Sequence, residues 1–220
     1  MRITSAFFFT FFILLSFSCE KSEHHSIPKT ANEALTALME GNERFINNAS
    51  IHHDFIDEAH HSEKDQHPHT FVLSCIDSRV PPEIVFDQGI GNLFVARVAG
   101  NIEDPNILGS MEYAVQVKGT KLLVVLGHSN CGAVQGAIDN VNLGHLTQLT
   151  NQIKVAFSHH RTYPLPEHLS NETGRLNVIS TIEHILSSSK IIRELVHQKK
   201  IKIVGTFYDL HTGKVELLQS

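Results

Sequence analysis

The sequence lacks a run of basic residues, and it lacks internal repeats. Its 220 residues include 18 Lys and Arg against 23 Asp and Glu, a formal charge of −5 with neutral histidine. A nucleic-acid partner needs clustered Lys and Arg to neutralise phosphates, so the composition argues against one. The composition does not argue against a small anionic substrate. One arginine or metal ion at a binding site can attract an anion even when the net charge of the chain is mildly negative. A chain of this length without repeats predicts one domain with a sizeable core.

The sequence also lacks an apolar run that would span a bilayer comfortably. The run from Ala6 to Phe17 follows the weakly positive Arg2 and precedes Cys19 with small residues in between. This is the arrangement of a secretory signal peptide. We therefore expect residues 1–18 to be a signal peptide and the mature chain to be exported to the periplasm. An uncleaved membrane anchor is the alternative.

Cys19 has two interpretations. Its position resembles a bacterial lipoprotein attachment site, which would hold the chain at a membrane through lipid alone, although Phe17 departs from the usual Leu, small, small pattern. The other interpretation is a free cysteine at the terminus of a soluble exported protein. Residues 19–29 are polar and predict a tether, so the folded domain is expected over residues 30–220.

Only two further cysteines exist, and both follow strand-like runs. Cys75 lies directly behind Phe71-Val72-Leu73, and His128 and Cys131 come directly after the run 122–126. Zinc takes thiolate and imidazole ligands, and a catalytic zinc keeps three protein ligands with one open position. Cys75, His128 and Cys131 supply that count. In an oxidising compartment the two cysteines could instead form a disulfide, but a structural bridge gives no reason for His128 to stand beside it.

The pattern Cys75-x-Asp77-x-Arg79 with His128-x-x-Cys131 resembles the β-class carbonic anhydrases. The segments that agree with it in order and spacing are Ser78-Arg79-Val80-Pro81-Pro82-Glu83, Phe86-Asp87-Gln88-Gly89, Leu93 to Asn101 and Gly127 to Ala133. The resemblance runs from about Thr30 to the C-terminal region. It implies a catalytic domain over residues 30–220 with one Zn²⁺ per subunit. It also implies a lyase that converts CO2 reversibly to bicarbonate and a proton, through attack of zinc-bound hydroxide on CO2.

Asp77 and Arg79 stand two residues apart on an extended segment. They can therefore face the same side, where Arg79 can hold Asp77 in a bidentate pair. The resemblance implies that Asp77 orients the hydroxide while this pair is intact. If Arg79 swings away, Asp77 becomes the fourth zinc ligand and closes the site. The plain alternative is an ordinary ion pair.

The resemblance further implies a substrate pocket at a subunit interface, in a homodimer or a dimer of dimers (a homotetramer). Gln66 would reach the partner's site and bind CO2 or bicarbonate, or else it is a turn residue before a proline. Phe94 and Tyr113 would line the apolar walls, and Gly100 allows close backbone approach to a ligand. The chain has no tryptophan. We therefore expect no inhibitory bicarbonate pocket of the kind that one family subtype builds partly from that residue.

The order of apolar runs predicts an α/β fold with a mostly parallel sheet. Helices are expected from Thr30, with a capping box to Glu33, and over 82–88, 105–118, 140–160 and 174–197, the last broken near residues 187–189. Val117 is expected to face the core, and residues 163–166 to form a loop. The resemblance adds the strand order 2-1-3-4, with an antiparallel edge strand over 214–218.

The segment 52–69 holds six histidines, and it also has two interpretations. It could bind a second metal or collect zinc, or it is a solvated surface. The histidines are His52, His53, His60, His61, His67 and His69.

Two other functions stay open from the sequence. Relatives with the same zinc ligands hydrolyse COS or CS2, which loops that narrow access to the zinc would favour, and no clear insertion is seen. A non-catalytic zinc-binding or zinc-buffering protein is the second. Storage needs neither Asp77 nor Arg79, so their presence speaks against it.

Overall fold

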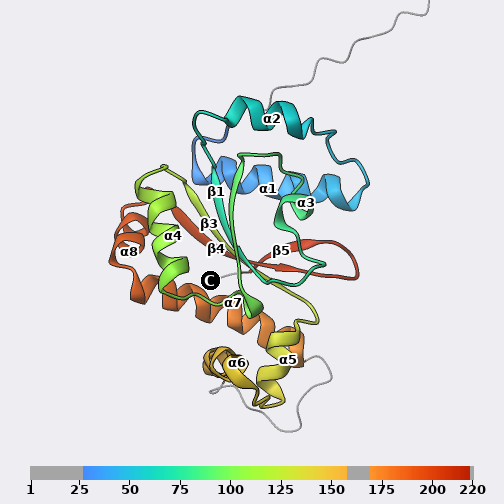
Figure 1. Cartoon of the computed structure of the whole chain (residues 1–220), viewed down its shortest axis with the longest axis vertical. Coiled ribbons are helices and arrows are strands. Elements are labelled where there is room, and N and C mark those ends of the chain that lie inside the picture. Colours follow the sequence, from blue (N-terminus) through green and yellow to red (C-terminus); the bar gives the residue numbers. More distant parts are fainter. Residues whose placement is uncertain (1–26, 158–168, 219–220) are drawn as a thin grey trace, which may run out of the picture.

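The computed structural model describes residues 27–157 and 169–218, and a five-stranded sheet forms its centre (Figure 1). The strands are β1 (Thr70–Ser74), β2 (Leu93–Arg97), β3 (Leu122–His128), β4 (Lys202–Tyr208) and β5 (Val215–Leu218). Their order is β2-β1-β3-β4-β5. The first four strands are parallel and β5 is antiparallel to β4. The expected α/β fold, strand order and edge strand are confirmed.

Helices cover both faces of the sheet. They are α1 (Ala31–Ile46), α2 (Phe55–Ser62), α3 (Pro82–Val85), α4 (Pro105–Gln116), α5 (Gly132–Ile138), α6 (Gly144–Phe157), α7 (Leu169–Ser188), α8 (Lys190–His197) and the 3-10 turn η1 (Ala99–Asn101). The predicted capping box is present, because Thr30 accepts the backbone N–H of Glu33 and Glu33 accepts that of Thr30. The predicted break falls at Ser189, whose hydroxyl caps α8.

The two central strands are apolar throughout because both of their faces are buried. Every residue of β1 and β3 is buried, as expected for parallel strands covered by helices on both sides. Alternate side chains point to opposite faces. Phe71 and Leu73 pack with α4, α7 and α8, whereas Val72 packs with α1 and α3. This packing fixes the register that brings the ends of β1 and β3 together.

One helix was not predicted, and one expectation about local structure was wrong. Residues 55–62 form α2, a helix that the sequence analysis did not identify; its available signal was Asp54, which accepts the N–H of Asp57 as an N-cap. The expectation that Val117 faces the core was wrong, because this residue is the C-cap of α4 and its side chain is 65% exposed.

Some expectations concern residues outside the described ranges. These are the signal peptide over 1–18, most of the tether, and the loop over 163–166. Within 27–157 and 169–218, no helix has the length and apolar character needed to cross a membrane.

Candidate metal centre

Cys75, His128 and Cys131 form one buried cluster. One ligand atom from each lies within 4.8 Å of the others. The two sulfur atoms are 3.9 Å apart, far beyond the length of about 2.05 Å that a disulfide requires, and both thiols are free. The structure therefore contradicts the disulfide alternative and brings together the three residues that the sequence pattern selects.

The sheet topology explains how residues that are distant in the sequence meet. Cys75 follows the last residue of β1, and His128 is the last residue of β3, its parallel neighbour. Parallel neighbours end at the same edge, which is where open α/β sheets place their ligands. Asn130 then takes a left-handed conformation (φ 54°), and the tight turn leaves Cys131 as the N-cap of α5.

His128 presents a bare nitrogen to the cluster. Its Nδ1 lies 2.9 Å from the Ser129 carbonyl oxygen. A carbonyl can only accept, so Nδ1 carries the hydrogen and Nε2 keeps its lone pair. Nε2 is buried and has no hydrogen-bond partner among the described residues. A buried acceptor without a donor is costly, whereas an imidazole fixed through its other nitrogen is the usual arrangement of a metal ligand. The donor set of one imidazole and two thiols therefore fits a soft divalent metal ion.

The two thiols ionise unequally. The pKa of Cys75 is lowered chiefly because the Cys131 thiol donates a hydrogen bond to it, with further help from the backbone N–H groups of Gly100 and Asp77. The same contact with Cys75, together with burial, raises the pKa of Cys131. One thiolate thus forms readily, and a second is opposed by the charge of the first. A bound cation would remove that opposition.

Asp77 and Arg79 form the bidentate pair that their spacing predicts. Arg79 Nε donates to Asp77 Oδ1 at 2.9 Å and Nη2 donates to Oδ2 at 2.7 Å. The backbone N–H of Arg79 adds a third bond to Oδ1. Arg79 thereby holds the pKa of Asp77 well below its usual range. Asp77 Oδ2 lies 3.9 Å from His128 Nε2, so an ionised carboxylate stands at the rim of the metal cluster.

Gly100 touches the cluster through its backbone. Its N–H donates to Cys75 Sγ at 3.4 Å. It adopts φ +72°, and a Cβ atom there would lie 2.5 Å from Ile153 Cδ1. The backbone of Gly100 therefore lies close to a metal-ligand residue of its own chain, and its expected approach to substrate stays a prediction.

Two supporting residues were missed from the sequence. Arg97, at the end of β2, donates from Nε to the Cys75 carbonyl at 2.8 Å and from Nη2 to the Asp77 carbonyl at 2.5 Å. Asn177 of α7 donates to the Gly100 carbonyl at 2.7 Å. The signal for Arg97 was its place at the end of an apolar run that neighbours β1. Asn177 lies within an ordinary helical pattern, which gives no signal of its role.

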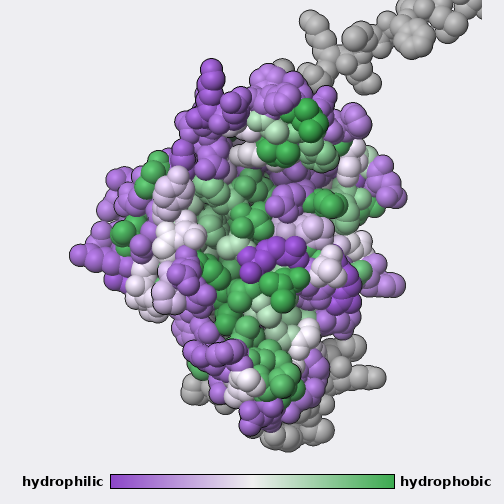
Figure 2. Space-filling model, viewed as in Figure 1, coloured by the Kyte–Doolittle hydropathy of each residue, from purple (hydrophilic) through white to green (hydrophobic). Residues whose placement is uncertain are grey.

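The other expected substrate residues, Phe94, Tyr113 and Gln66, lie apart from this cluster within one chain. Phe94 and Tyr113 meet edge to face, with ring centroids 6.2 Å apart. With Phe71 they line a groove of about 640 Å³ along the outer edge of β2, and none of the three ligands lines it. Figure 2 shows apolar side chains gathered on the face that carries this edge. Gln66 is exposed four residues before β1, at the opposite end of that strand from Cys75.

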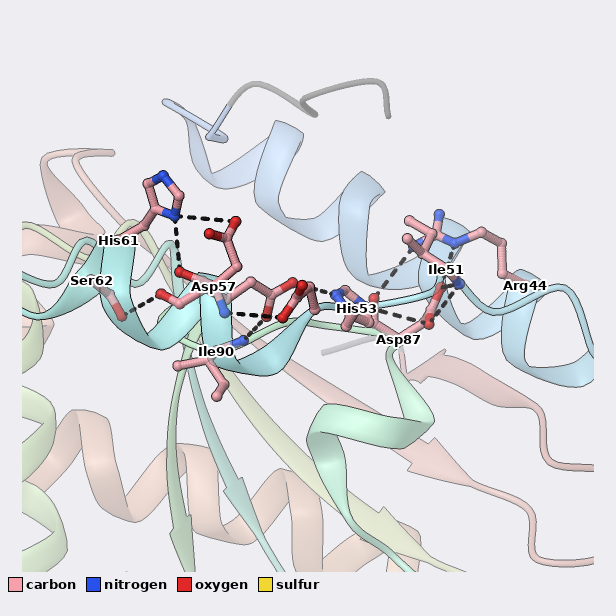
Figure 3. Close-up of polar contacts among 10 residues, drawn as sticks. Arg44, Ile51, His53, Asp57, His61, Ser62, Asp87 and Ile90 are labelled. Carbon is pink, nitrogen blue, oxygen red and sulfur yellow. Dashed lines mark hydrogen bonds and ion pairs between the residues drawn. The ribbon is translucent and has the colours of Figure 1, made fainter. Parts of the chain in front are cut away.

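Two histidines of the histidine-rich segment contact carboxylates (Figure 3). His53 Nδ1 lies 2.7 Å from Glu58, and its Nε2 lies 3.8 Å from Asp87. His61 lies 3.3 Å from Asp57. In the part of the chain that the structure describes, the Cys75 cluster is the only group of three metal-ligating side chains close enough to share an ion. The described residues of the segment 52–69 therefore do not form a second group of this kind.

Comparisons with known proteins identify the family of this chain. A family model described as "Carbonic anhydrase" matches residues 70–215. The chain is 35% identical to "Carbonic anhydrase 2" of Mycobacterium tuberculosis over 190 residues, which cover 84% of this chain and 91% of that protein. It is also 35% identical, with the same coverage, to a carbonic anhydrase of Mycolicibacterium smegmatis.

Solved structures show the same architecture. One of them is a tetrameric β-carbonic anhydrase from the filamentous ascomycete Sordaria macrospora. It superimposes with a TM-score of 0.66 at 27% identity, covering 74% of this chain and 90% of that one.

Proposed function

Because this chain belongs to the β-class carbonic anhydrases, we propose that Cys75, His128 and Cys131 hold a zinc ion and that the protein hydrates CO2 reversibly to bicarbonate and a proton. The observation that carries this proposal is the Arg79–Asp77 pair at the rim of the cluster. A metal store has no use for an ionised carboxylate held in place beside the ligands.

Each residue has a defined task in this reaction. Zinc, when bound, is a Lewis acid that lowers the pKa of a water molecule from near 16 toward about 7 and so provides the nucleophile at neutral pH. Asp77, kept ionised by Arg79, is an acceptor only. It accepts the hydrogen of the attacking oxygen and thereby directs a lone pair toward the carbon of CO2. Both oxygens of Asp77 are bound by Arg79, which keeps the carboxylate from becoming a fourth metal ligand.

We propose further that two copies of the chain complete each substrate pocket. β2 is an edge strand, and the apolar groove along it leaves Tyr113 44% exposed. A second copy would cover this groove and bring its own Gln66 to the metal centre. A homodimer or a dimer of dimers satisfies this requirement.

The same proposal assigns the parts of the chain and its location. Residues 1–18 direct export to the periplasm, residues 19–29 are the tether, and residues 30–220 are the catalytic domain. Cys19 carries the lipid if the chain is anchored. The mass of the N-terminal peptide of the cellular protein tests whether the chain is cut before Cys19 and whether Cys19 carries a lipid.

The first experiment is stopped-flow CO2 hydration by the purified chain at pH 7 and above pH 8.5, with its zinc content determined. Zinc at about one per chain and activity at both pH values support a site in which Asp77 stays with Arg79. Cys75→Ser should lose both zinc and activity, and Cys19→Ser should lose neither. Activity only at the higher pH would mean that Asp77 closes the site near neutrality. Zinc without any hydration would refute the proposal and direct attention to COS, CS2 or metal storage.

Mixing two defective variants tests the shared pocket. Gln66→Leu should impair the partner's site, and Cys75→Ser its own. In a mixed dimer, one site combines an intact Cys75 with an intact Gln66 from the other subunit. The mixture should therefore recover activity that neither variant shows alone. No recovery, with mixed dimers shown to form, would refute the shared pocket.

A further inference from the structure

Five lysines line one groove of the protein, and no carboxylate lines it. The groove has a volume of about 510 Å³. Its charged lining residues are Lys29, Lys121, Lys199, Lys200 and Lys202, and the other six are uncharged. Acidic residues outnumber basic ones in the whole chain, 23 to 18. The composition therefore does not explain this concentration of positive charge, which we call the lysine groove.

Regular structure fixes the positions of these lysines. Lys121 directly precedes β3, and Lys202 is the first residue of β4. The two are joined by a backbone hydrogen bond of 3.0 Å. Lys199 and Lys200 form the turn between α8 and β4, where Lys199 has a left-handed φ of 57°. Lys29 immediately precedes the N-cap of α1. The charges converge because the amino ends of the strands and two helix termini meet here.

None of the five lysines forms an ion pair with any residue that the structure describes. The one side-chain hydrogen bond that we find among them runs from Lys202 Nζ to the neutral amide of Asn32. The nearby Glu33 is engaged in the capping box of α1. Lys118, by contrast, pairs with Asp65. Like charges held together repel one another, and an external anionic surface would relieve that repulsion.

We propose that the lysine groove docks on the anionic surface of a lipid bilayer. The chain that precedes the groove points to this partner. Residues 1–26 join the fold at Ile27, beside Lys29, and they include the apolar run from Ala6 to Phe17 and Cys19. Lys29 follows Cys19 by ten steps along the chain, a reach of at most about 35 Å. Any membrane attachment at or before Cys19 therefore keeps the groove close to the lipid headgroups.

The positive charge of the lysine groove would add membrane affinity that a single lipid anchor does not provide. One acyl chain gives only marginal membrane binding, and stable attachment needs a second signal such as a polybasic patch. Each lysine near an anionic surface strengthens binding by about fivefold, within a Debye length. A small soluble anion would account for the lysines, but not for their position where the N-terminal segment enters the fold.

Docking in this way would orient the metal centre. The groove lies at the amino ends of β3 and β4, and His128 lies at the carboxyl end of β3. Seven residues of strand separate the two ends by about 23 Å. The metal centre then faces away from the bilayer, where dissolved substrate reaches it freely.

Vesicle sedimentation of the purified chain from Cys19 onward tests this proposal without any reference to catalysis. Binding to phosphatidylcholine vesicles measures attachment that does not depend on lipid charge. The increase in binding to vesicles that contain phosphatidylglycerol measures the contribution of the groove. The test variant combines Lys29→Gln, Lys199→Gln and Lys200→Gln, side chains for which we find no hydrogen bond in the described structure. The matched control combines Lys64→Gln, Lys154→Gln and Lys214→Gln, which removes the same charge elsewhere.

We expect the wild-type chain to prefer anionic vesicles, with a preference that weakens as salt rises. The ratio of binding to anionic vesicles over binding to neutral vesicles should fall about a hundredfold in the test variant. In the control it should fall less than about threefold. Equal losses in the two variants, or equal wild-type binding to both kinds of vesicle, would overturn the proposal. So would release from anionic vesicles by millimolar inorganic phosphate at constant ionic strength, because the groove would then be a site for a small anion. Circular dichroism of both variants verifies that they are folded.

Discussion

The side-chain amide of Asn177 donates to the carbonyl oxygen of Gly100, 77 residues away in the sequence, at 2.7 Å. The N–H of the same Gly100 donates to the Cys75 sulfur. Asn177 is buried on α7, so a helix on one face of the sheet fixes the backbone that supports a metal ligand. The geometry of the cluster therefore depends on a residue for which we find no hydrogen bond to any of the three ligands in the described structure.

Asn177→Ala should weaken metal binding. The substitution leaves the Gly100 carbonyl without its donor and frees the peptide that contacts Cys75. Loss of such a supporting contact typically costs 10- to 100-fold in metal affinity. Zinc affinity is measured by competition with a chromophoric chelator, with Asn151→Ala on the exposed surface of α6 as the control. An affinity equal to that of the control would show that the bond does not support the cluster.

Arg97→Ala should reduce kcat more than it raises KM. Arg97 donates hydrogen bonds to the carbonyl oxygens of Cys75 and Asp77. Without these bonds, the segment that carries the Cys75 ligand and the Asp77 carboxylate is less firmly positioned. Misplacement of catalytic groups by about 1 Å costs on the order of 100-fold in rate. Stopped-flow CO2 hydration separates the two constants.

The control for Arg97 is Arg193→Ala. Arg193 is also exposed and also donates to two backbone carbonyls, at the turn between α7 and α8. Its removal should leave kcat unchanged. If both variants lose activity equally, the effect reflects general loosening of the fold rather than positioning of the site.

The sequence was informative wherever short-range chemistry determines the structure. The capping box at Thr30 and the cysteines behind β1 and β3 depend on neighbouring residues, and so does the spacing of Asp77 and Arg79. The contacts of Arg97 and Asn177 depend on which strands and helices become neighbours, and single-chain periodicity does not encode this. The proposed role of Gln66 depends on a second chain, so the contacts within one chain do not test it.

Asp87→Ala should destabilise the fold by about 2–4 kcal/mol. The Asp87 carboxylate is buried and accepts from Arg44 Nε at 2.6 Å and from the Ile51 N–H (Figure 3). Its removal leaves a half-buried guanidinium and a backbone donor without their partner. Urea unfolding measures the loss. Asp139→Ala, which removes an exposed carboxylate from the end of α5, should cost less than about 0.5 kcal/mol, and a similar loss in both variants would count against a structural role for Asp87.

Glu103 should make stability depend on pH. It is buried beside α6 and α7, with Oε1 facing His184 Nδ1 at 3.4 Å and Gln152 Nε2 at 3.4 Å. Its other oxygen, Oε2, lacks a partner among the described residues. Burial raises the pKa of this carboxyl, against the opposing effects of His184 and Gln152.

A raised pKa favours the neutral acid in the fold. The stabilising contribution of Glu103 is therefore fully present below its ordinary pKa of 4.5 and is lost as the pH rises through the folded-state pKa. Glu103→Gln keeps the shape and stays neutral. The free energy of unfolding of the wild-type protein, minus that of the variant, should thus fall as the pH rises above 4.5. Metal release at low pH affects both proteins and cancels in the difference. A difference that rises with pH would mean that His184 outweighs burial and that the folded protein prefers the ionised carboxylate.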